Sequence, residues 1–458
     1  MVPQPQNNST RISVEEYAAL AKSQGAKLEE MSLTPEEKVL RKFNQKYAVV
    51  RTSTTYILVQ KTETSFELDS RQSFIHFHEN DFFVNSKGKE ESKAYFWLKH
   101  SERRTFENIV FDPGHPGDYD GNYNIFKGFS VQPVQGDCSL YWTHVQEVIC
   151  NGDEISYQYV RKWMACVVQR PKVLATALVL RGLQGTGKNM FADLFGRLLG
   201  PYYLTVTNLE HVTGKFNNHL KYAYLIHANE AIWGGTKKEV GALKALITDP
   251  TIMIEGKGKD AICVDNCRHL IVSSNEDWAV PMDLDDRRFF ALNVSADRKG
   301  DTKYFEDLEK QMSCGGLSAL LYDLLHEDVS DFDPRVMPPN DSGFDMKMKT
   351  AGSTEKFLYA ALSEGRLNIS TSSKTGEWKP YPTKDIYYYY KEWCHEEGLR
   401  HETDSEFGKR IKKIIGVEKS RRSIEGGGRE RWYEFSSLEE CRKRFEKFTK
   451  QTDRIWED

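Results

Sequence analysis

Through the middle of the chain, continuous runs of apolar residues alternate with stretches in which apolar residues recur at helical spacing. The runs are residues 173–180 (VLATALVL), 222–227 (YAYLIH) and 269–275 (HLIVSSN). Uninterrupted apolar strands of this kind are typical of a parallel sheet whose two faces are both covered. The pattern therefore predicts a three-layer α/β domain, with helices on either face of a parallel sheet.

The flanking segments have different patterns. Short aromatic and β-branched runs between polar turns predict a small mixed α/β domain, whereas the polar, proline-bearing start of the chain is typical of a flexible arm. A stretch rich in helix breakers predicts a linker after the three-layer domain. We expect an arm over 1–36, an N-terminal domain over 37–150, the three-layer domain with a preceding helix over 151–326, a linker over 327–353 and a C-terminal domain over 354–458.

The predicted C-terminal domain combines an amphipathic helix with a basic hairpin. In residues 405–416 the apolar residues share one side of a helix, and the next segment predicts a hairpin that turns at residues 426–428. From residue 407 to residue 431 there are nine Lys or Arg and three Glu. This combination is typical of a winged helix that contacts DNA phosphates, and a packing domain with a solvated basic surface is the alternative. The candidate DNA contacts are Lys409, Lys412, Arg421 and Arg422.

Composition narrows the classes of protein further. Hydrophobic residues make up 39% of the 458, and no window reaches the ~18 consecutive apolar residues that a membrane span needs. We expect a soluble, cytoplasmic protein without a membrane partner. The eight cysteines are scattered, which argues against a zinc ribbon or a disulfide scaffold and favours buried reduced thiols. A net charge of −4 means that any nucleic-acid surface is local.

The segment after the first apolar run has the form of a phosphate-binding loop. Residues 182–189 read GLQGTGKN and precede an apolar helical pattern, so strand, glycine loop and helix occur in the required order. The N–H groups of such a loop surround phosphate oxygens, and the lysine neutralises the β and γ phosphates. The candidate ATP-binding residues are Gly182, Gly185, Thr186, Gly187, Lys188 and Asn189.

Two asparagines stand where magnesium contacts are expected. The residue after the loop lysine is ordinarily Ser or Thr, whose hydroxyl binds Mg²⁺, but here it is Asn189. A second ligand position, directly before the candidate base, ordinarily carries an acid and here is Asn229. An amide carbonyl is also a neutral oxygen donor. ATP and Mg²⁺ therefore remain the expected cofactors, with Asn189 and Asn229 as the candidate metal ligands.

Polar residues end the second and third apolar runs. Glu230 follows the second run and is the candidate base that orients water toward the γ-phosphate. Asn275 ends the third run and could hold that water or contact the γ-phosphate. Arg287 and Arg288 come next, and either could reach the phosphates of a neighbouring subunit. A salt bridge with one of the two preceding aspartates is the alternative for these arginines.

Residues 251–265 read as two β-type runs joined by the lysine-containing sequence EGKGK. This pattern predicts a hairpin with Lys257 and Lys259 near its tip. If the tip projects into a pore, these lysines would contact the phosphates of a DNA strand. A solvated turn is the alternative.

In their order and spacing, GLQGTGKN, YLIHANE, IEGKGKD, HLIVSSN and DDRRFFAL resemble the superfamily 3 helicases of the AAA+ class, in particular the phage and plasmid primase-helicases. Upstream segments are similar to the helicase-like C-terminal region of deep-sea vent phage primase-polymerases. The resemblance implies an AAA+ core, a homo-hexameric ring with ATP at subunit interfaces, an arginine acting in trans, and 3′-to-5′ movement on single-stranded DNA. It also implies that a primase-polymerase domain can precede such a chain.

The leading functional hypothesis is an ATP-dependent, ring-forming DNA helicase of a viral or mobile-element replication system, acting on single-stranded or forked DNA. The alternative is an oligomeric DNA-binding replication scaffold that binds nucleotide but hydrolyses it weakly, which the asparagines at positions 189 and 229 favour. A small-molecule kinase would explain the phosphate-binding loop, but it gives no role to Asn275 or to the basic C-terminal segment.

Overall fold

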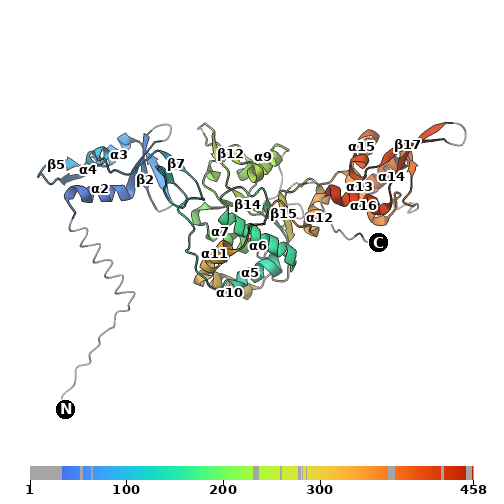
Figure 1. Cartoon of the computed structure of the whole chain (residues 1–458), viewed down its shortest axis with the longest axis horizontal. Helices are drawn as coiled ribbons and strands as arrows, with labels where there is room; N and C mark the ends of the chain where they lie inside the picture. Colours follow the sequence, from blue (N-terminus) through green and yellow to red (C-terminus); the bar gives the residue numbers. More distant parts are fainter. Residues whose placement is uncertain are drawn as a thin grey trace, which may run out of the picture. The chain divides into compact units, whose positions relative to one another are not determined.

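The computed structural model describes residues 33–51, 55–62, 65–230, 237–257, 260–276, 280, 282–284, 286–369, 377–423, 428–449 and 456 (Figure 1). The chain divides into two compact units, Met1–Gly128 and Phe129–Asp458. Most of the predicted arm, and Lys259 of the predicted hairpin, lie outside the described residues. Within the described ranges, no helix has both the length and the apolar character that a membrane crossing requires.

The first unit is a mixed α/β domain, as the sequence predicts. Its helix α2 (Pro35–Lys46) begins with a capping box, in which Thr34 and Glu37 each accept a backbone N–H of the other. A four-stranded sheet of order β3-β2-β1-β6 is covered by helices that bury Phe43, Phe74 and Trp97. The remaining elements are β1 (Tyr47–Arg51), β2 (Thr55–Gln60), β3 (Phe66–Asp69), α3 (Arg71–Phe77), β4 (Phe82–Val84), β5 (Glu90–Ser92), α4 (Lys93–Lys99), β6 (Thr105–Phe106), β7 (Asn108–Val110) and β8 (Asn122–Asn124).

The second unit contains the predicted parallel sheet. Five strands, all parallel, have the order β10-β11-β14-β9-β15. They are β9 (Ala177–Arg181), β10 (Tyr203–Val206), β11 (Leu225–Ala228), β14 (His269–Ser274) and β15 (Phe289–Asn293). The chain leaves β9 toward one side of the sheet and finally returns to its other side as β15. The carboxyl end of β9 therefore lies at the switch point where open α/β sheets bind ligands.

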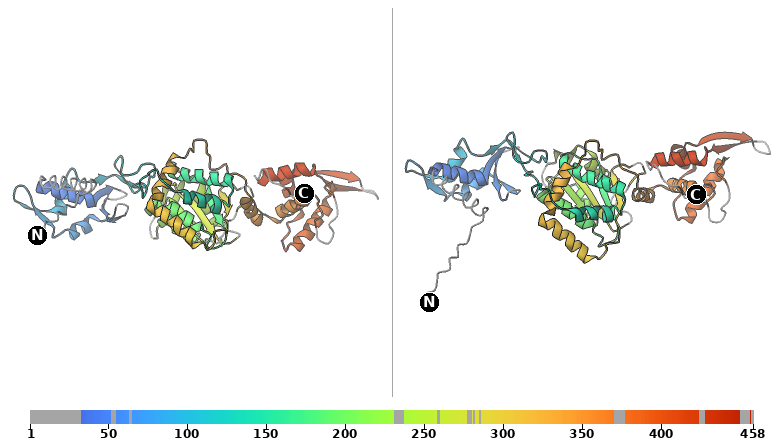
Figure 2. Two further views of the ribbon diagram at one scale, coloured as in Figure 1. Left: turned by 90° about the horizontal axis from the view of Figure 1, so that it is seen from below. Right: turned by 60° about the horizontal axis from the view of Figure 1, so that its bottom comes forward.

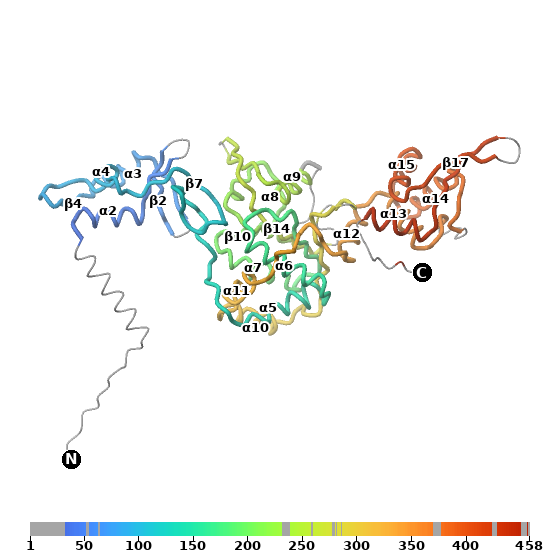
Figure 3. Tube along the Cα trace, viewed as in Figure 1, coloured from blue at the N-terminus to red at the C-terminus, as the bar shows by residue number. Residues whose placement is uncertain are grey.

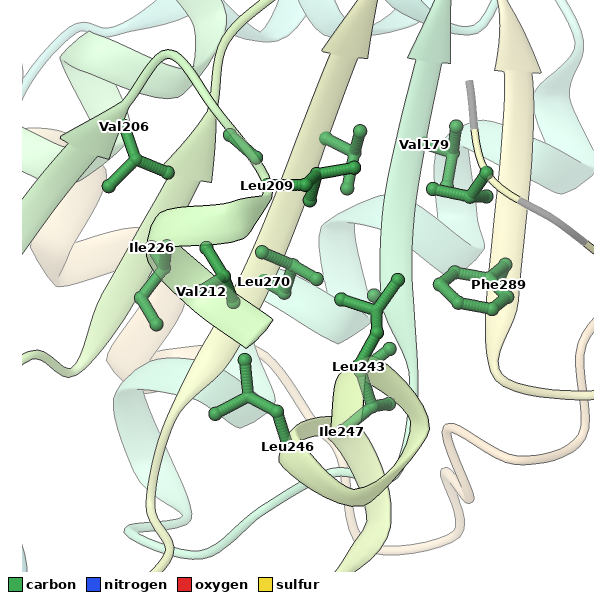
Figure 4. Close-up of a cluster of buried hydrophobic side chains, with 14 of the residues drawn as sticks. Val179, Val206, Leu209, Val212, Ile226, Leu243, Leu246, Ile247, Leu270 and Phe289 are labelled. Atoms are coloured by element: carbon green, nitrogen blue, oxygen red, sulfur yellow. The ribbon is translucent and has the colours of Figure 1, made fainter. Parts of the chain in front are cut away.

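Helices cover both faces of this sheet (Figure 2), which confirms the predicted three layers. On one face, Leu243 and Ile247 of α9 (Lys237–Thr248) pack with Val179, Leu270 and other strand residues (Figure 4). On the opposite face lies α6 (Glu154–Gln169), where the ring of Tyr159 is 4.2 Å from that of Phe290, centroid to centroid. We call residues 139–326 the three-layer domain.

Shorter elements complete the three-layer domain and shift its predicted boundary. The Tyr141 hydroxyl of α5 donates to the carbonyl of Phe191 in α7 (3.1 Å). Residues 129–150 accordingly belong to the second unit and not to the N-terminal domain, so the boundary lies at 128 and not at 150. The elements are α5 (Ser139–Thr143), the π-helix η1 (His144–Ile149), α7 (Lys188–Arg197), η2 (Gly200–Tyr202), α8 (Glu210–Thr213), η3 (Asn218–Leu220), β12 (Thr251–Ile254), β13 (Ile262–Asp265), α10 (Thr302–Gln311), η4 (Met312–Gly316) and α11 (Leu317–His326).

The C-terminal part of the second unit has its own hydrophobic core. A three-stranded antiparallel sheet of order β16-β18-β17 accompanies four helices, and the predicted amphipathic helix is present as α15, with its apolar side buried. The elements are α13 (Ser353–Glu364), β16 (Tyr381–Pro382), α14 (Thr383–Glu396), α15 (Asp404–Ile415), β17 (Glu418–Ser423), β18 (Arg429–Glu434) and α16 (Leu438–Thr449). We call residues 353–449 the C-terminal domain.

The segment predicted as a linker contains a helix. The trace in Figure 3 passes from α11 through α12 (Asp341–Thr350) to α13. Met346 of α12 is buried in the core beside the parallel sheet, and Phe344 is buried in the C-terminal core. The breaker-rich composition concealed this helix because only these few apolar residues mark it.

Candidate functional site

The loop between β9 and α7 turns through glycines with left-handed backbone. Gly185 and Gly187 have φ of 78° and 94°. A Cβ on Gly187 would lie 2.5 Å from Cε1 of His144 and 2.8 Å from Cε1 of Phe305, so this position also lacks room for a side chain. The hydroxyl of Thr186 closes the loop by donating to the carbonyl of Leu183 (2.9 Å). Loop and helix start enclose a cavity of about 270 Å³, which Asn189, Asn229, Glu230 and Asn275 also line.

The ammonium of Lys188 lies at the centre of this loop. It donates to the carbonyls of Gly182 (2.5 Å) and Leu183 (2.7 Å) and to Oδ1 of Asn275 (2.9 Å). Burial lowers the pKa of Lys188, and the nearby Glu230 carboxylate opposes that shift. A buried ammonium held by neutral oxygens alone is suited to exchange those contacts for the oxygens of an anion.

Asn275 links the lysine to the candidate base. Its Nδ2 donates to Oε1 of Glu230 (3.3 Å), while its Oδ1 accepts from Lys188. The three residues follow β9, β11 and β14, whose carboxyl ends meet at one edge of the sheet. Glu230 has φ of 52°, a left-handed conformation that is costly for a residue with a side chain and that clusters at functional sites. The structure thus brings together three residues that the sequence singled out separately.

The two asparagines offer oxygen donors that fit a magnesium ion. Asn189 lies in the first turn of α7 and is exposed to the cavity. Oδ1 of Asn229 is buried and has no hydrogen-bond partner in the described structure. Buried polar atoms are ordinarily satisfied, so an unpaired one beside a cavity points to a missing water, ion or ligand. Neutral amide oxygens and the Glu230 carboxylate match the oxygen ligands that Mg²⁺ prefers.

Sequence reasoning missed a histidine that contacts the loop. His144, in the π-helix η1, lies with Nε2 3.1 Å from the carbonyl of Gly187 and Nδ1 3.1 Å from the hydroxyl of Tyr304 in α10. Burial lowers the pKa of His144 to about 4, so the ring is neutral at pH 7. Nε2–H then donates to Gly187, and Nδ1 accepts from Tyr304. No local motif signals this contact, because the partners are 43 and 160 residues away in the chain.

The two candidate arginines have different surroundings. Arg288 donates through Nη1 to Oδ1 of Asp286 (3.4 Å), and its backbone N–H bonds the same oxygen. Asp286 is buried and also pairs with Lys244 (3.2 Å). The salt bridge that the sequence allowed as an alternative is therefore present at Arg288. Arg287 is exposed and has no ion pair or hydrogen-bonded side-chain partner among the described residues.

The predicted lysine hairpin is present as β12 and β13, which pair antiparallel from Thr251↔Asp265 to Ile254↔Ile262. Lys257 is exposed beyond the last strand pair, and Lys259 is not among the described residues.

The candidate DNA contacts of the C-terminal domain also divide into two kinds. Lys409, Lys412 and Arg421 are exposed and have no side-chain partner within the described ranges. Arg422 instead pairs with Glu434 across the hairpin (2.7 and 2.9 Å) and lies over the ring of Trp432. Strand alternation places Arg421 on the other face, directly opposite Arg431.

Comparisons with known proteins match several parts of the chain. The model of a family of unknown function (DUF5906) matches residues 180–288, which run from the end of β9 to Arg288. A model described as Poxvirus D5 protein-like matches residues 368–450 in the C-terminal domain. The DNA primase-polymerase of Nitratiruptor phage NrS-1 is 28% identical over 136 residues, a match that covers 29% of this chain and only 19% of that relative.

Solved structures of the NrS-1 C-terminal region extend the likeness. Its apo structure has a TM-score of 0.65 and 16% identity, covering 88% of this chain and all of the solved one. The A-form apo structure gives 0.65 and 15%, covering 87% and 99%. At this identity the likeness shows a shared fold. The predicted resemblance to a phage primase-polymerase is confirmed as a likeness of sequence and fold.

Proposed function

We propose that this chain is an ATP-dependent, ring-forming DNA helicase or translocase of a phage-type replication system, with an AAA+ core and a winged-helix C-terminal domain. The observation that carries the proposal is the bonded series Lys188, Asn275 and Glu230 at the carboxyl ends of three strands. It combines a phosphate-binding cation, a polar amide and a carboxylate in one cavity, which is the set that phosphoryl transfer to water requires.

Each residue of the series has a distinct role in this proposal. The triphosphate takes over the contacts that Lys188 makes with the Gly182 and Leu183 carbonyls, and the loop N–H groups surround its oxygens. Glu230 orients the attacking water and accepts its proton, and Asn275 holds both Glu230 and the γ-phosphate region in place. Asn189 and Asn229 would hold Mg²⁺, directly or through water. The metal would supply charge neutralisation between the β and γ phosphates.

Movement on DNA is proposed from the surroundings of this site. Arg287 is exposed and has no side-chain partner within the described ranges, so it can reach the triphosphate of a neighbouring subunit in a homo-hexamer, whereas Arg288 is engaged by Asp286. The hairpin of β12 and β13 presents Lys257, and Lys259 follows in sequence, as contacts for a single strand. The likeness to a phage primase-polymerase supports a role in DNA replication, and a primase-polymerase domain in the same full-length polypeptide is part of the proposal.

The test is ATP turnover measured with and without single-stranded DNA, beside unwinding of a forked duplex. We expect turnover that DNA stimulates, and unwinding that requires hydrolysable ATP. Lys188→Ala should remove nucleotide binding, and Glu230→Gln should retain binding while turnover falls by about 10² or more. Lys172→Ala, at an exposed lysine of the same domain without a side-chain partner among the described residues, is the control for the loss of a lysine. Unchanged ATP binding by Lys188→Ala would reject the site.

A second candidate function is a replication scaffold that binds nucleotide for assembly and hydrolyses it weakly. The observation that favours it is the pair of amides, Asn189 and Asn229, at the candidate metal positions, since neither contributes a negative charge. Assembly on ATP addition with turnover no faster than in Glu230→Gln would support the scaffold. Restoring the usual ligands with Asn189→Thr and Asn229→Asp should then raise turnover without changing assembly.

A further inference from the structure

A second cavity adjoins the phosphate loop. It is an open cavity of about 600 Å³, a volume within the range of ligand sites, and Gly185, Met190 and Phe305 line both cavities. Its other lining residues lie along α10, with Gly300 just before the helix and Ser313 just after it. The second cavity therefore lies directly beside the candidate phosphate site, within reach of a ligand bound there.

Phe305 is the aromatic side chain at this junction. It is half-buried on α10, its ring contacts the backbone of the phosphate loop at Gly187, and it is 6.1 Å from the His144 ring, centroid to centroid. One part of the ring is thus fixed against the loop, and another part lines open space. Such an aromatic face can stack on a planar ring of a ligand.

The start of α10 is fastened to the phosphate loop through neighbouring side chains. Asp301 caps the helix by accepting the N–H of Tyr304 (3.1 Å), and the hydroxyl of Tyr304 bonds Nδ1 of His144, which in turn bonds Gly187. The guanidinium of Arg298 lies over the Tyr304 ring, 4.7 Å from its centroid. These contacts hold Phe305 in a defined position relative to the loop, which is the condition for a built site.

Polar groups also line the second cavity. Glu306 and Lys310 line it, are exposed, and make no side-chain hydrogen bond or ion pair in the described part of the chain. Glu309, by contrast, is engaged by Arg197 and by the hydroxyl of Ser313 (3.1 Å). The free carboxylate can accept hydrogen bonds from an amine, and the free ammonium can donate to ring nitrogens or hydroxyls.

We propose that the second cavity binds the nucleobase of the nucleotide, with Phe305 as its stacking surface and with Glu306 and Lys310 beside the edge of the base or its ribose. The ligand class is a nucleoside triphosphate and not an inorganic polyphosphate. This inference rests on the proposed function of the phosphate loop and adds which part of the ligand the α10 side recognises. Phe305 acts in binding; it makes no contact with the reacting phosphate in this assignment.

The experiment compares three ligands, with Mg²⁺ present throughout, by titration calorimetry: ATP, inorganic tripolyphosphate and adenosine. We expect the unaltered protein to bind ATP at least tenfold more tightly than tripolyphosphate. Phe305→Ala should weaken ATP and adenosine binding by about 5- to 150-fold, the range for loss of one aromatic stacking contact, and leave tripolyphosphate binding unchanged. Phe305→Tyr keeps the ring and should restore ATP binding.

Two further variants separate the base site from the phosphate site. Lys188→Ala should lose tripolyphosphate while keeping adenosine, and Phe77→Ala, an exposed phenylalanine of the first unit, should change nothing. Equal affinity for ATP and tripolyphosphate, or equal weakening of both by Phe305→Ala, would overturn the base site and leave the phosphate site standing. Binding of neither triphosphate by the unaltered protein would overturn the proposed function and this inference with it.

Discussion

The three-layer domain and the C-terminal domain each contain two consecutive arginines. In each of these pairs, one arginine side chain forms an ion pair and the other does not, among the described residues. In each pair one guanidinium bonds an acid of its own chain: Arg288 with Asp286, and Arg422 with Glu434. The other, Arg287 or Arg421, is exposed and without a side-chain partner among the described residues. Sequence alone gives the two members of each pair equal standing as candidates.

The difference lies in what surrounds the bonded member. The side chain of Asp286 is fully buried and forms ion pairs with both Arg288 and Lys244. These two ion pairs therefore belong to the interior of the three-layer domain. Glu434 is partly exposed on the hairpin, where its pairing with Arg422 contributes little stability. In both regions, the arginine that has no partner in the described part of the chain has its charge available for an external anion. The acids, more than the arginines, decide which cation is available.

The strongest test of this division is the rate of ATP turnover. If Arg287 completes the site of a neighbouring subunit, Arg287→Ala should lower turnover by about 10³-fold or more and leave nucleotide binding nearly unchanged. Arg288→Ala should instead lower the free energy of unfolding by about 1–3 kcal/mol, because it removes one of the two cationic side chains that pair with buried Asp286. Turnover assays and urea unfolding of both variants measure the two effects. Loss of turnover in Arg288→Ala, together with loss of stability in Arg287→Ala, would contradict the prediction.

The second largest expected difference between the two regions is the loss of stability in acid. Burial lowers the pKa of His144 and of His227 to about 4, and that of His269 to about 3. An unfolded histidine has a pKa near 6.5, so between about pH 6.5 and 4 the unfolded state binds more protons. The free energy of unfolding therefore falls as the pH falls through this window, by about 1.4 kcal/mol per pH unit for each buried histidine.

The C-terminal domain provides the contrast for that measurement. Its described histidines, His395 and His401, are exposed. Hydrogen exchange between pH 7 and 5, corrected for the intrinsic exchange rate, should show protection lost first in peptides of the three-layer domain. His227→Gln should reduce the pH dependence, and His395→Gln should leave it unchanged. Simultaneous loss of protection in both regions would contradict the assignment of acid sensitivity to the buried histidines.

Much of the candidate site follows from the order of elements in the sequence. Lys188 ends the glycine loop after the first apolar run, and Glu230 and Asn275 come at the ends of the next two runs. Parallel strands bring their carboxyl ends to one edge of the sheet, which brings the three residues together. Hydrophobic periodicity also located α15, predicted at 405–416, to within one residue at each end. These features are either local in the sequence or follow from the rule that the carboxyl ends of parallel strands lie at the same edge of a sheet.

What the sequence concealed depends on contacts between distant side chains. His144 precedes Gly187 in the sequence and Phe305 follows it, each at a long distance along the chain. No sequence motif predicts that the folded chain brings both rings to this glycine. The helix α12 was missed because its polar composition outweighs its few buried residues. The distinction between Arg287 and Arg288 needs the orientation of Asp286, which periodicity cannot supply.

The smallest expected effect concerns the hairpin of the C-terminal domain. Arg421 lies directly opposite Arg431, and like charges in such a cross-strand pair destabilise a sheet unless an anion lies between them. If that anion is a DNA phosphate, Arg421→Ala should weaken DNA binding several-fold and reduce the slope of log affinity against log salt by about 0.9 for a duplex or 0.7 for a single strand. Arg422→Ala, the matched control, should leave the slope unchanged because its charge is already neutralised by Glu434. Equal changes in slope for the two variants would show that pairing within the chain does not decide which arginine contacts DNA.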